Sequence, residues 1–212
     1  IKEYAINDSR FRFETSEIGS ENLKQKKRAL DAGIKIAKYD NLLFTDVDCR
    51  ISPSWAKTLS SNFIEGVDYV VGYTQTPKPL NRVSLFQSID FFMLISAANG
   101  AINRNWYWSS SGQNQGFRRD IYEKCNGYTE IAKYIQGDDS LFLQICRKKI
   151  ENFSASFAMQ NHARIICRQE TRLIPLILQR LRWAGDARHM WKFNPIFFLM
   201  VVATFLSNIF IL

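Results

Sequence analysis

Short apolar runs alternate with amphipathic stretches along most of this chain, and this pattern predicts a layered α/β fold. Residues 41–45 (NLLFT) and residues 67–73 are apolar and short enough to be buried strands. Ser52 and Pro53 lie between them and predict the start of a helix, with Ser as the N-cap and Pro in the first turn. Strand, helix and strand at this spacing are typical of βαβ units, so we expect a mostly parallel sheet.

The segment before the first of these strands predicts a helix from Ser20 to about Lys38. Its inner face consists of apolar residues at helical spacing: Leu23, Leu30, Ile34 and Ala37. The remaining elements follow from the same patterns. We expect a short strand at 10–14, a helix at 80–98, a loop-rich region with short strands at 106–119, a helix at 138–149, and strands at 154–159 and 163–168.

Residues 171–191 predict an amphipathic helix of an unusual kind. At about 100° per residue, one apolar stripe forms, made of Ile174, Ile177, Leu178, Leu181 and Ala184. Gln179, Arg182 and Trp183 stand at i, i+3 and i+4 and share the opposite face. A helix of this type beside a membrane span is expected to lie flat in the membrane interface. An ordinary amphipathic helix packed on a core is the alternative.

The last segment, 195–212, is apolar except for Thr204, Ser207 and Asn208. Its length fits a transmembrane helix, with a buried core helix as the alternative. The basic residues that precede it place the domain before it on the cytoplasmic side of a plasma or inner membrane: Arg180, Arg182, Arg188 and Lys192. We therefore expect a catalytic domain at 1–170, an interfacial amphipathic helix at 171–192 and a transmembrane helix at 193–212.

The net charge of +8 indicates either an anionic partner or a solvated basic surface. The basic residues are scattered and no basic-aromatic pattern of a nucleic-acid reader is present, so nucleic acid is not expected as a partner. The four cysteines form no CxxC pair, which predicts buried, reduced thiols instead of a zinc site or a disulfide framework. His162 and His189 are expected to be surface or interface residues rather than metal ligands.

Two acidic residues, Asp46 and Asp48, directly follow the first predicted strand. In an extended segment they point to the same side, and at the carboxyl end of a parallel strand they face the crevice where open α/β sheets bind ligands. Two like charges held together there are costly without a cation. Mg²⁺ or Mn²⁺ bridging to a diphosphate would meet this need. A turn in which Asp caps a helix is the alternative.

A second acidic pair, Asp138 and Asp139, follows Gly137 at a predicted helix start. Helix capping alone would explain it, but one carboxylate can cap while the other enters a cleft as a general base. Between the two pairs lies a segment, 109–128, in which Gly112 and Gly116 permit close backbone approach and Gln113, Asn114 and Gln115 offer hydrogen bonds of the kind that sugars need. A plain polar loop is the alternative there.

These motifs in this order resemble the family 2 inverting glycosyltransferases, in particular the membrane-bound branch with cellulose, chitin and hyaluronan synthases and ceramide glucosyltransferase. The resemblance extends from about Lys24 to the C-terminus. It rests on the following sequence: K-x-x-A-L at 26–30, TDVD at 45–48, G-x-N-x-x-F-R at 112–118, GDD at 137–139, and QRLRW at 179–183 followed by an apolar run.

The resemblance implies a Rossmann-like GT-A fold, a nucleotide-sugar donor (a UDP-sugar is favoured), a lipid or glycan acceptor, contact with membrane lipids, and Mg²⁺ or Mn²⁺. The site roles that it implies are as follows. Asp46 and Asp48 would hold the metal and the donor diphosphate, Lys26 would lie near the nucleotide, and Asp139 would be the catalytic base; Gly112, Asn114, Asp138, Gln179, Arg182 and Trp183 would bind the acceptor, with the motif at 179–183 also holding the leaving diphosphate.

Two departures from the family pattern affect this interpretation. The family's opening strand and its base-reading loop have no match, which suggests that the first βαβ unit is missing, and Asp31 stands where the family usually has Asn. Apart from these departures, the resemblance implies a glycosyltransferase that acts by single displacement with inversion. The alternative is a membrane-anchored, non-catalytic remnant that binds glycan or nucleotide. The sugar, the acceptor and processivity are not specified.

Overall fold

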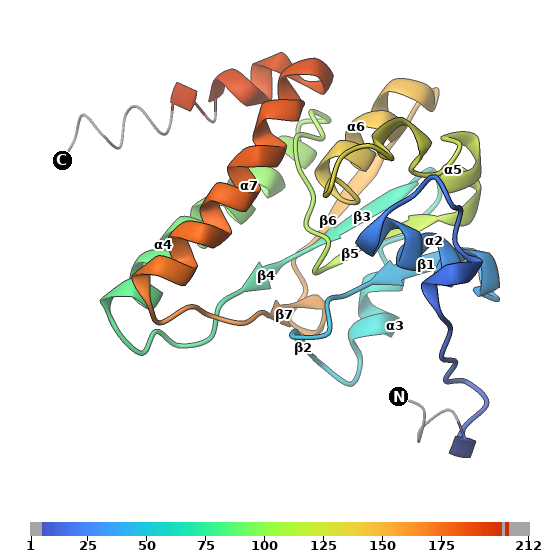
Figure 1. The fold of residues 1–212 in the computed structure, drawn as a ribbon, viewed down its shortest axis with the longest axis horizontal. Coiled ribbons are helices and arrows are strands. Elements are labelled where there is room, and N and C mark those ends of the chain that lie inside the picture. The colour runs from blue at the N-terminus through green and yellow to red at the C-terminus, as the bar shows by residue number, and fades with distance from the viewer. Residues whose placement is uncertain (1–5, 201, 204–212) are drawn as a thin grey trace.

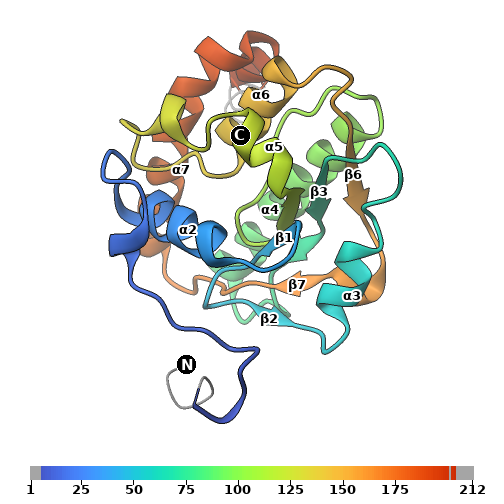
Figure 2. The ribbon, with the colours of Figure 1, turned by 90° about the vertical axis from the view of Figure 1, so that its right-hand side faces the viewer.

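The computed structural model describes residues 6–200 and 202–203. The chain forms a mixed α/β fold in which helices cover both faces of a twisted sheet (Figures 1 and 2). The elements in chain order are η1 (Ser16–Ile18), α2 (Gln25–Ile36), β1 (Asn41–Phe44), β2 (Arg50–Ile51), α3 (Trp55–Ser60), β3 (Tyr69–Gly72), β4 (Thr74–Gln75), α4 (Arg82–Ile102), β5 (Gln115–Arg118), α5 (Arg119–Lys124), η2 (Thr129–Ile131), α6 (Ser140–Lys149), β6 (Ala155–Ala158), η3 (Asn161–Ala163), β7 (Ile165–Ile166) and α7 (Leu173–Phe193).

The main sheet has four strands in the order β1-β5-β3-β6. Strands β1 and β3 each pair antiparallel with β5, and β3 pairs parallel with β6. A small second sheet has the order β2-β7-β4, with one antiparallel and one parallel pair. The prediction of a mostly parallel sheet is therefore wrong in its pairing. Three strands of the main sheet do run in one direction, but β5 separates β1 from β3 and opposes both.

The main sheet is buried on both faces, as its short apolar strands predict. Side chains alternate along a strand, so Tyr69 and Val71 of β3 enter one core, while Val70 enters the other. The larger core lies between the sheet and helices α2, α5 and α6, and the smaller one includes Trp55 and Leu59 of α3. The expected helix and strand types at 41–45, 67–73, 80–98, 138–149, 154–159 and 163–168 are confirmed, with boundaries that differ by a few residues.

Three local predictions at the N-terminal side are wrong. Residues 10–14 are not a strand. Helix α2 begins at Gln25, because the Ser20 backbone N–H and hydroxyl donate to the Asp31 carboxylate (2.7 and 2.8 Å) instead of capping a helix. Helix α3 has Ser54, not Ser52, at its N-cap position. The expected inner face of α2 is confirmed, because Leu23 and Ile34 are buried in the larger core, where Leu30 and Ala37 also pack.

The cysteines are free thiols, and three of the four are buried, as expected. Cys125 and Cys146 lie together in the larger core, with their sulfur atoms 3.7 Å apart. Cys49 is half-buried, and burial raises the pKa of its thiol to about 11. Each thiol is therefore explained by packing.

Helices α4 and α7 lie against each other at one end of the molecule (Figure 1). The predicted apolar stripe of α7 does not pack on the core: Ile174, Ile177, Leu178 and Leu181 are 47 to 69% exposed. Helix α4 also exposes large apolar side chains: Leu85, Phe86, Ile89, Phe92, Met93 and Leu94. The two helices together thus present an apolar surface to solvent, which we call the α4/α7 apolar surface.

Within residues 6–200 and 202–203, α4 is the helix that is long and apolar enough to cross a membrane, on length and composition alone. The expected transmembrane helix at 193–212 falls partly outside the described residues. Its described part is helical at 195–200 and 202–203, after a break at Asn194 that ends α7.

Candidate functional site

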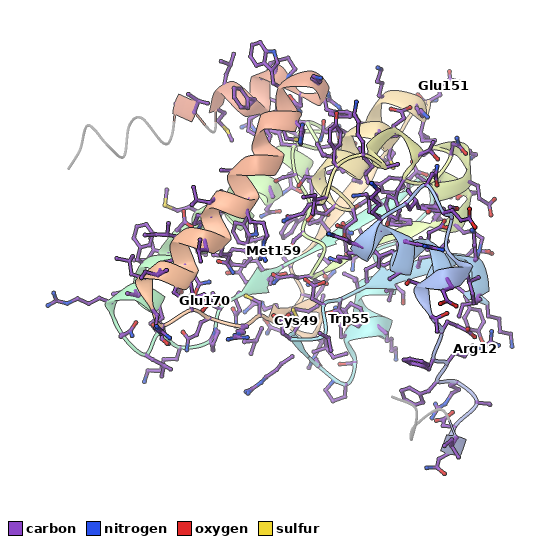
Figure 3. The ribbon with its side chains drawn as sticks, viewed as in Figure 1. Arg12, Cys49, Trp55, Glu151, Met159 and Glu170 are labelled. Atoms are coloured by element: carbon purple, nitrogen blue, oxygen red, sulfur yellow. The ribbon has the colours of Figure 1, made fainter. Side chains whose placement is uncertain are left out.

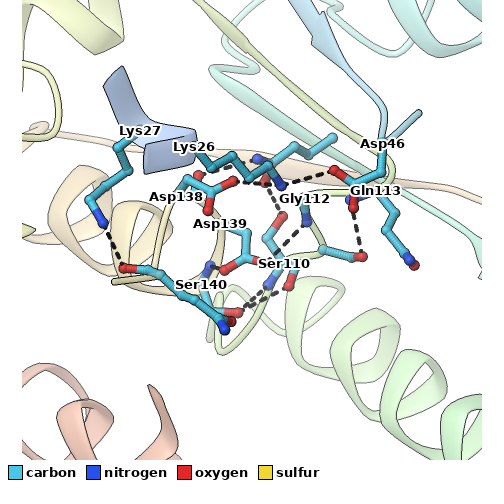
Figure 4. Close-up of polar contacts among 12 residues, drawn as sticks. Lys26, Lys27, Asp46, Ser110, Gly112, Gln113, Asp138, Asp139 and Ser140 are labelled. Carbon is cyan, nitrogen blue, oxygen red and sulfur yellow. Dashed lines mark hydrogen bonds and ion pairs between the residues drawn. The ribbon is translucent and has the colours of Figure 1, made fainter. Parts of the chain in front are cut away.

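The candidate site forms where the carboxyl end of β1 meets the start of α6, and Lys26 lies at its centre (Figure 4). The Lys26 ammonium is 2.9 Å from Asp46 Oδ1 and 3.0 Å from Asp138 Oδ2. One cation thus bridges the two acidic pairs, which are more than 90 residues apart in the sequence. This arrangement satisfies the requirement that clustered carboxylates need a nearby positive charge. Although burial lowers the pKa of Lys26, the charges of Asp138 and Asp46 outweigh it and raise that pKa.

Asp139 occupies the N-cap position of α6 and accepts two backbone hydrogen bonds. Its Oδ1 accepts from the Ser140 N–H (2.6 Å), and its Oδ2 accepts from the Gly112 N–H (3.1 Å). Burial and then the charge of Asp138 raise the pKa of Asp139 to about 6, although the two backbone donors and Lys26 lower it. A carboxylate with a pKa close to neutral can accept a proton efficiently, which is the property of a general base.

Gly112 lies directly beside these charges. A Cβ atom at this position would be 2.9 Å from Lys26 Nζ and 3.2 Å from Asp138 Oδ2. A side chain here would therefore push on the flexible end of Lys26, and glycine leaves the ion pair undisturbed. This observation agrees with the predicted close backbone approach at Gly112.

A buried polar network supports the acidic loop from behind. The side chain of Gln115, the first residue of β5, donates to the Asp138 carbonyl (3.2 Å) and accepts from the Ser110 hydroxyl (2.7 Å). Ser140 and Ser110 are joined twice, since the Ser140 hydroxyl accepts from the Ser110 N–H and donates to the Ser110 carbonyl. These bonds hold the segment before β5 against the start of α6.

Asn114, a predicted acceptor-binding residue, is fully buried. Its amide accepts from the Trp55 indole N–H (3.0 Å; Trp55 is labelled in Figure 3) and donates to the carbonyls of Tyr73 and Ala163 (2.9 Å each). These bonds join α3, the end of β3 and η3. The structure thus uses the Asn114 side chain inside the fold and does not bring it to the acidic cluster.

Asp48 lies apart from the Lys26 bridge and is exposed. Its charge acts on the thiol of Cys167, whose pKa rises to about 12, mainly through burial; Arg180 of α7 opposes this rise. Asp46 and Asp48 both act on the Cys49 thiol, whose pKa burial and then their charges raise. Asp46 also pairs with Lys26, while Asp48 is exposed.

The predicted residues of the QRLRW segment lie on α7 next to α4. Gln179 Oε1 accepts from Gln87 Nε2 (3.3 Å), and the Trp183 ring packs against Phe91, with their centroids 6.1 Å apart. Trp183 and Cys49 pack against the same buried cluster, which brings α7 toward the end of the Asp46–Asp48 segment. Arg182, in contrast, is exposed.

Sequence reasoning missed Arg180. Its guanidinium forms an ion pair with Asp90 of α4 (2.5 Å) and lies over the Trp183 ring, 4.2 Å from the ring centroid. Arg180 and Arg182 point about 200° apart around a helix, so the two arginines lie on different faces. The i, i+3 spacing of Arg180 and Trp183 places them on the same face, and this spacing is the sequence signal that could have indicated their contact.

The described residues, 6–200 and 202–203, contain no group of three or more His, Cys, Asp or Glu side chains that could hold a metal. Asp46 and Asp48 still offer the hard oxygen ligands that Mg²⁺ and Mn²⁺ prefer, so a metal here would take its other ligands from a bound diphosphate and water. The histidines are outside this set. His162 Nδ1 is 3.3 Å from the Ser52 hydroxyl, and the His189 ring stacks on Tyr134.

No protein-family model matches this chain, and no curated protein matches it either.

Proposed function

We propose that this chain is the catalytic part of an inverting glycosyltransferase with a GT-A type fold, which transfers a sugar from a nucleotide-diphosphate sugar to a hydroxyl of a lipid or glycan. The observation that supports this proposal best is the Lys26 bridge, which joins Asp46 to the Asp138–Asp139 pair. Lys26, Asp46 and Asp139, three of the residues expected from the resemblance to bind the donor or act as the base, therefore lie close together, although they come from α2, the end of β1 and the start of α6.

In this proposal Asp139 removes the proton of the acceptor hydroxyl as the oxygen attacks the sugar carbon, and the bond to the diphosphate breaks in the same step. The raised pKa of Asp139 suits this role, and its two backbone donors fix the orientation of the carboxylate. Lys26 offers a positive charge beside the departing diphosphate, and the glycine at 112 leaves room for ligand close to the acids.

Asp46 and Asp48 would hold Mg²⁺ or Mn²⁺ together with the donor, which is most simply a UDP-sugar. When bound, such an ion stabilises the negative charge of the leaving diphosphate. Gln179, Arg182 and Trp183 would act from α7 on the acceptor side. The exposed guanidinium of Arg182 is available to an anionic group, and Trp183 already borders the cluster that includes Cys49.

We also propose that the α4/α7 apolar surface rests on a membrane. Both helices expose several large apolar side chains, and the exposed Arg82, Arg172 and Arg182 on or next to them would meet anionic headgroups. Helix α4 is long and apolar enough to cross a membrane, but Phe91, Ile95 and Ala98 of its inner face are buried in the protein. We therefore propose that α4 lies in the membrane interface.

The function is tested with Asp46→Asn in the full-length protein. We expect this variant to lose metal-dependent binding of UDP-sugars and transfer of radiolabelled sugar into lipid or glycan. Asp40→Asn is the matched control, because Asp40 precedes β1 and its side chain is 91% exposed. Normal transfer by Asp46→Asn would refute the proposal. Donor binding without transfer or donor hydrolysis by the wild type would favour the non-catalytic remnant instead.

The membrane proposal is tested by flotation with liposomes of phosphatidylcholine and phosphatidylglycerol. Phe86→Glu combined with Leu178→Glu changes one exposed residue on each helix. We expect this pair to reduce flotation about tenfold or more, because charges in the interface are costly. Glu replacements at Ile135 and Ile64, which are equally exposed but lie elsewhere, serve as the control. Equal flotation of both variants would contradict the assignment of this surface.

A further inference from the structure

Lys27, the residue after the bridging Lys26, has a fully buried side chain. Burying a lysine ammonium is costly unless its charge is compensated and its three N–H donors are all used. A residue on the first turn of a half-exposed helix could easily place this ammonium in water. Its burial therefore indicates that the ammonium has a specific task inside the protein.

The Lys27 ammonium donates to three consecutive backbone carbonyls. Its Nζ atom is 2.5 Å from the Tyr134 oxygen and 3.1 Å from the oxygens of both Ile135 and Gln136. Three donors thus meet three acceptors that converge on one point, and Figure 4 shows Lys27 reaching this loop from α2. Three carbonyl dipoles directed at one cation compensate much of its burial cost.

These carbonyls belong to the loop that leads into the acidic pair. Gln136 is followed by Gly137, whose φ of +102° lies in the left-handed region, and then by Asp138 and Asp139. A glycine in this conformation has little intrinsic preference to keep it there. The loop before it must consequently be fixed from outside if the two carboxylates are to keep their positions.

We propose that Lys27 is a positioning residue for Asp138 and Asp139, which it holds in place through the backbone of residues 134–136. Adjacent residues in a helix point about 100° apart, so the first turn of α2 sends Lys26 to the front of the acidic loop and Lys27 to its back. The proposal rests on the proposed function, because it concerns the base of that reaction.

A second contact anchors the same loop from the other side. The Tyr134 ring stacks on His189 of α7, with centroids 3.9 Å apart. The loop is therefore held between α2 and α7, and Lys27 provides the part of this support that is nearest in sequence to Gly137. Loss of the three Lys27 hydrogen bonds should release Asp138 and Asp139 without unfolding the larger core.

The test is Lys27→Met in the full-length protein, because Met has a similar volume and no donors. Lys149→Met is the matched control: Lys149 also donates to a backbone carbonyl, that of Cys125, and pairs with Glu130, but it lies away from the acidic loop. We expect kcat of Lys27→Met to fall about tenfold to 100-fold, with the donor KM changed less than about twofold, since misplacement of a catalytic group affects the chemical step. Lys149→Met should keep both constants.

A merely structural Lys27 would change the melting temperature alone, and the pH profile separates the two roles. Release of the loop weakens the hydrogen bonds from Gly112 and Ser140 that lower the pKa of Asp139, but it also exposes the carboxylate to water and so reduces the burial that raises this pKa most. The acid limb of the pH profile of kcat should accordingly move to lower pH in Lys27→Met. An unchanged kcat and acid limb, measured on folded protein well below its melting temperature, would overturn the proposal.

Amide hydrogen exchange provides a readout that does not depend on activity. We expect the amides of residues 112 and 137–140 to exchange faster in Lys27→Met and to be unchanged in Lys149→Met. If the wild type neither binds nor transfers a sugar donor, the proposed function fails, while faster exchange would still show that Lys27 positions this loop. Unchanged exchange would overturn the positioning role itself.

Discussion

The acidic cluster and the QRLRW segment of α7 were predicted with the same kind of reasoning, but the structure treats them differently. In the cluster, Asp46, Asp138 and Lys26 are joined by ion pairs of 2.9 and 3.0 Å. On α7, the predicted residues separate: Gln179 binds α4, while Arg182 faces solvent. Residues at the end of a strand and the start of a helix are fixed by the fold, whereas the partner of a helix face depends on which element packs against it.

The largest expected effect concerns the base. Asp139→Asn should lower transfer by about 10²- to 10⁴-fold, because an amide cannot accept the acceptor proton. Donor binding, measured by calorimetry, should remain. The wild-type activity should fall as the pH drops below about 6, where Asp139 becomes protonated.

Asp138→Asn provides the contrast for this prediction. It removes the like charge that raises the pKa of Asp139, so the acid limb should move to lower pH while some transfer remains. If instead Asp138→Asn abolishes transfer and Asp139→Asn does not, Asp138 is the base and Asp139 is only a helix cap.

The next effect concerns the cation at the centre of the cluster. Lys26→Met should weaken donor binding about 10- to 100-fold, since a hydrogen bond to a charged group is worth about 1.5 to 3 kcal/mol. It should also move the acid limb to higher pH, because Lys26 lowers the pKa of Asp139. Lys24→Met, on an exposed residue just before α2, is the control. Equal donor binding in the two variants would show that the ion pairs serve the fold alone.

On α7, paired variants sharpen the comparison. Arg180→Ala removes the ion pair with Asp90 and the contact with the Trp183 ring, and should destabilise the protein by about 1 to 2 kcal/mol. Arg182→Ala should change stability by less than about 0.5 kcal/mol, but it should lower transfer if this residue binds the acceptor. Thermal unfolding and transfer assays on both variants separate the two effects. A loss of stability in Arg182→Ala would contradict the division of roles.

The smallest effect concerns Asp31, which stands where the resemblance leads one to expect Asn. Burial raises its pKa, but hydrogen bonds from Ser20, Tyr122 and Lys35 outweigh this and lower it. A lowered pKa means that Asp31 contributes stability above its unfolded pKa of about 3.9 and that this contribution disappears as the pH falls. Tyr122→Phe removes one donor, 2.7 Å from Asp31 Oδ1, and should cost about 1 kcal/mol at pH 7 and less at pH 3. Denaturant unfolding at both pH values measures this difference.

The sequence was most informative where local rules decide the structure. The strand before Asp46 and the helix after Asp139 follow from apolar periodicity and capping, so both acidic pairs were placed correctly at element ends. Ser20 shows the limit, because a distant carboxylate, Asp31, competes for its hydroxyl and moves the helix start to Gln25. Lys27 shows another limit: the resemblance singled out Lys26, but no pattern in the sequence predicted that the side chain of Lys27 is buried under the loop before the acidic pair.

The direction of β5, antiparallel to both β1 and β3, decides which residues lie beside the acidic cluster. Gln115 pairs with Phe44 at the end of β1 and with Val71 near the end of β3. If β5 ran in the opposite direction, Arg118 would lie beside the acidic residues and Gly112 would lie near the opposite ends of β1 and β3. The direction of β5 therefore places Gly112, which has no side chain, beside the charges immediately before the chain enters the sheet.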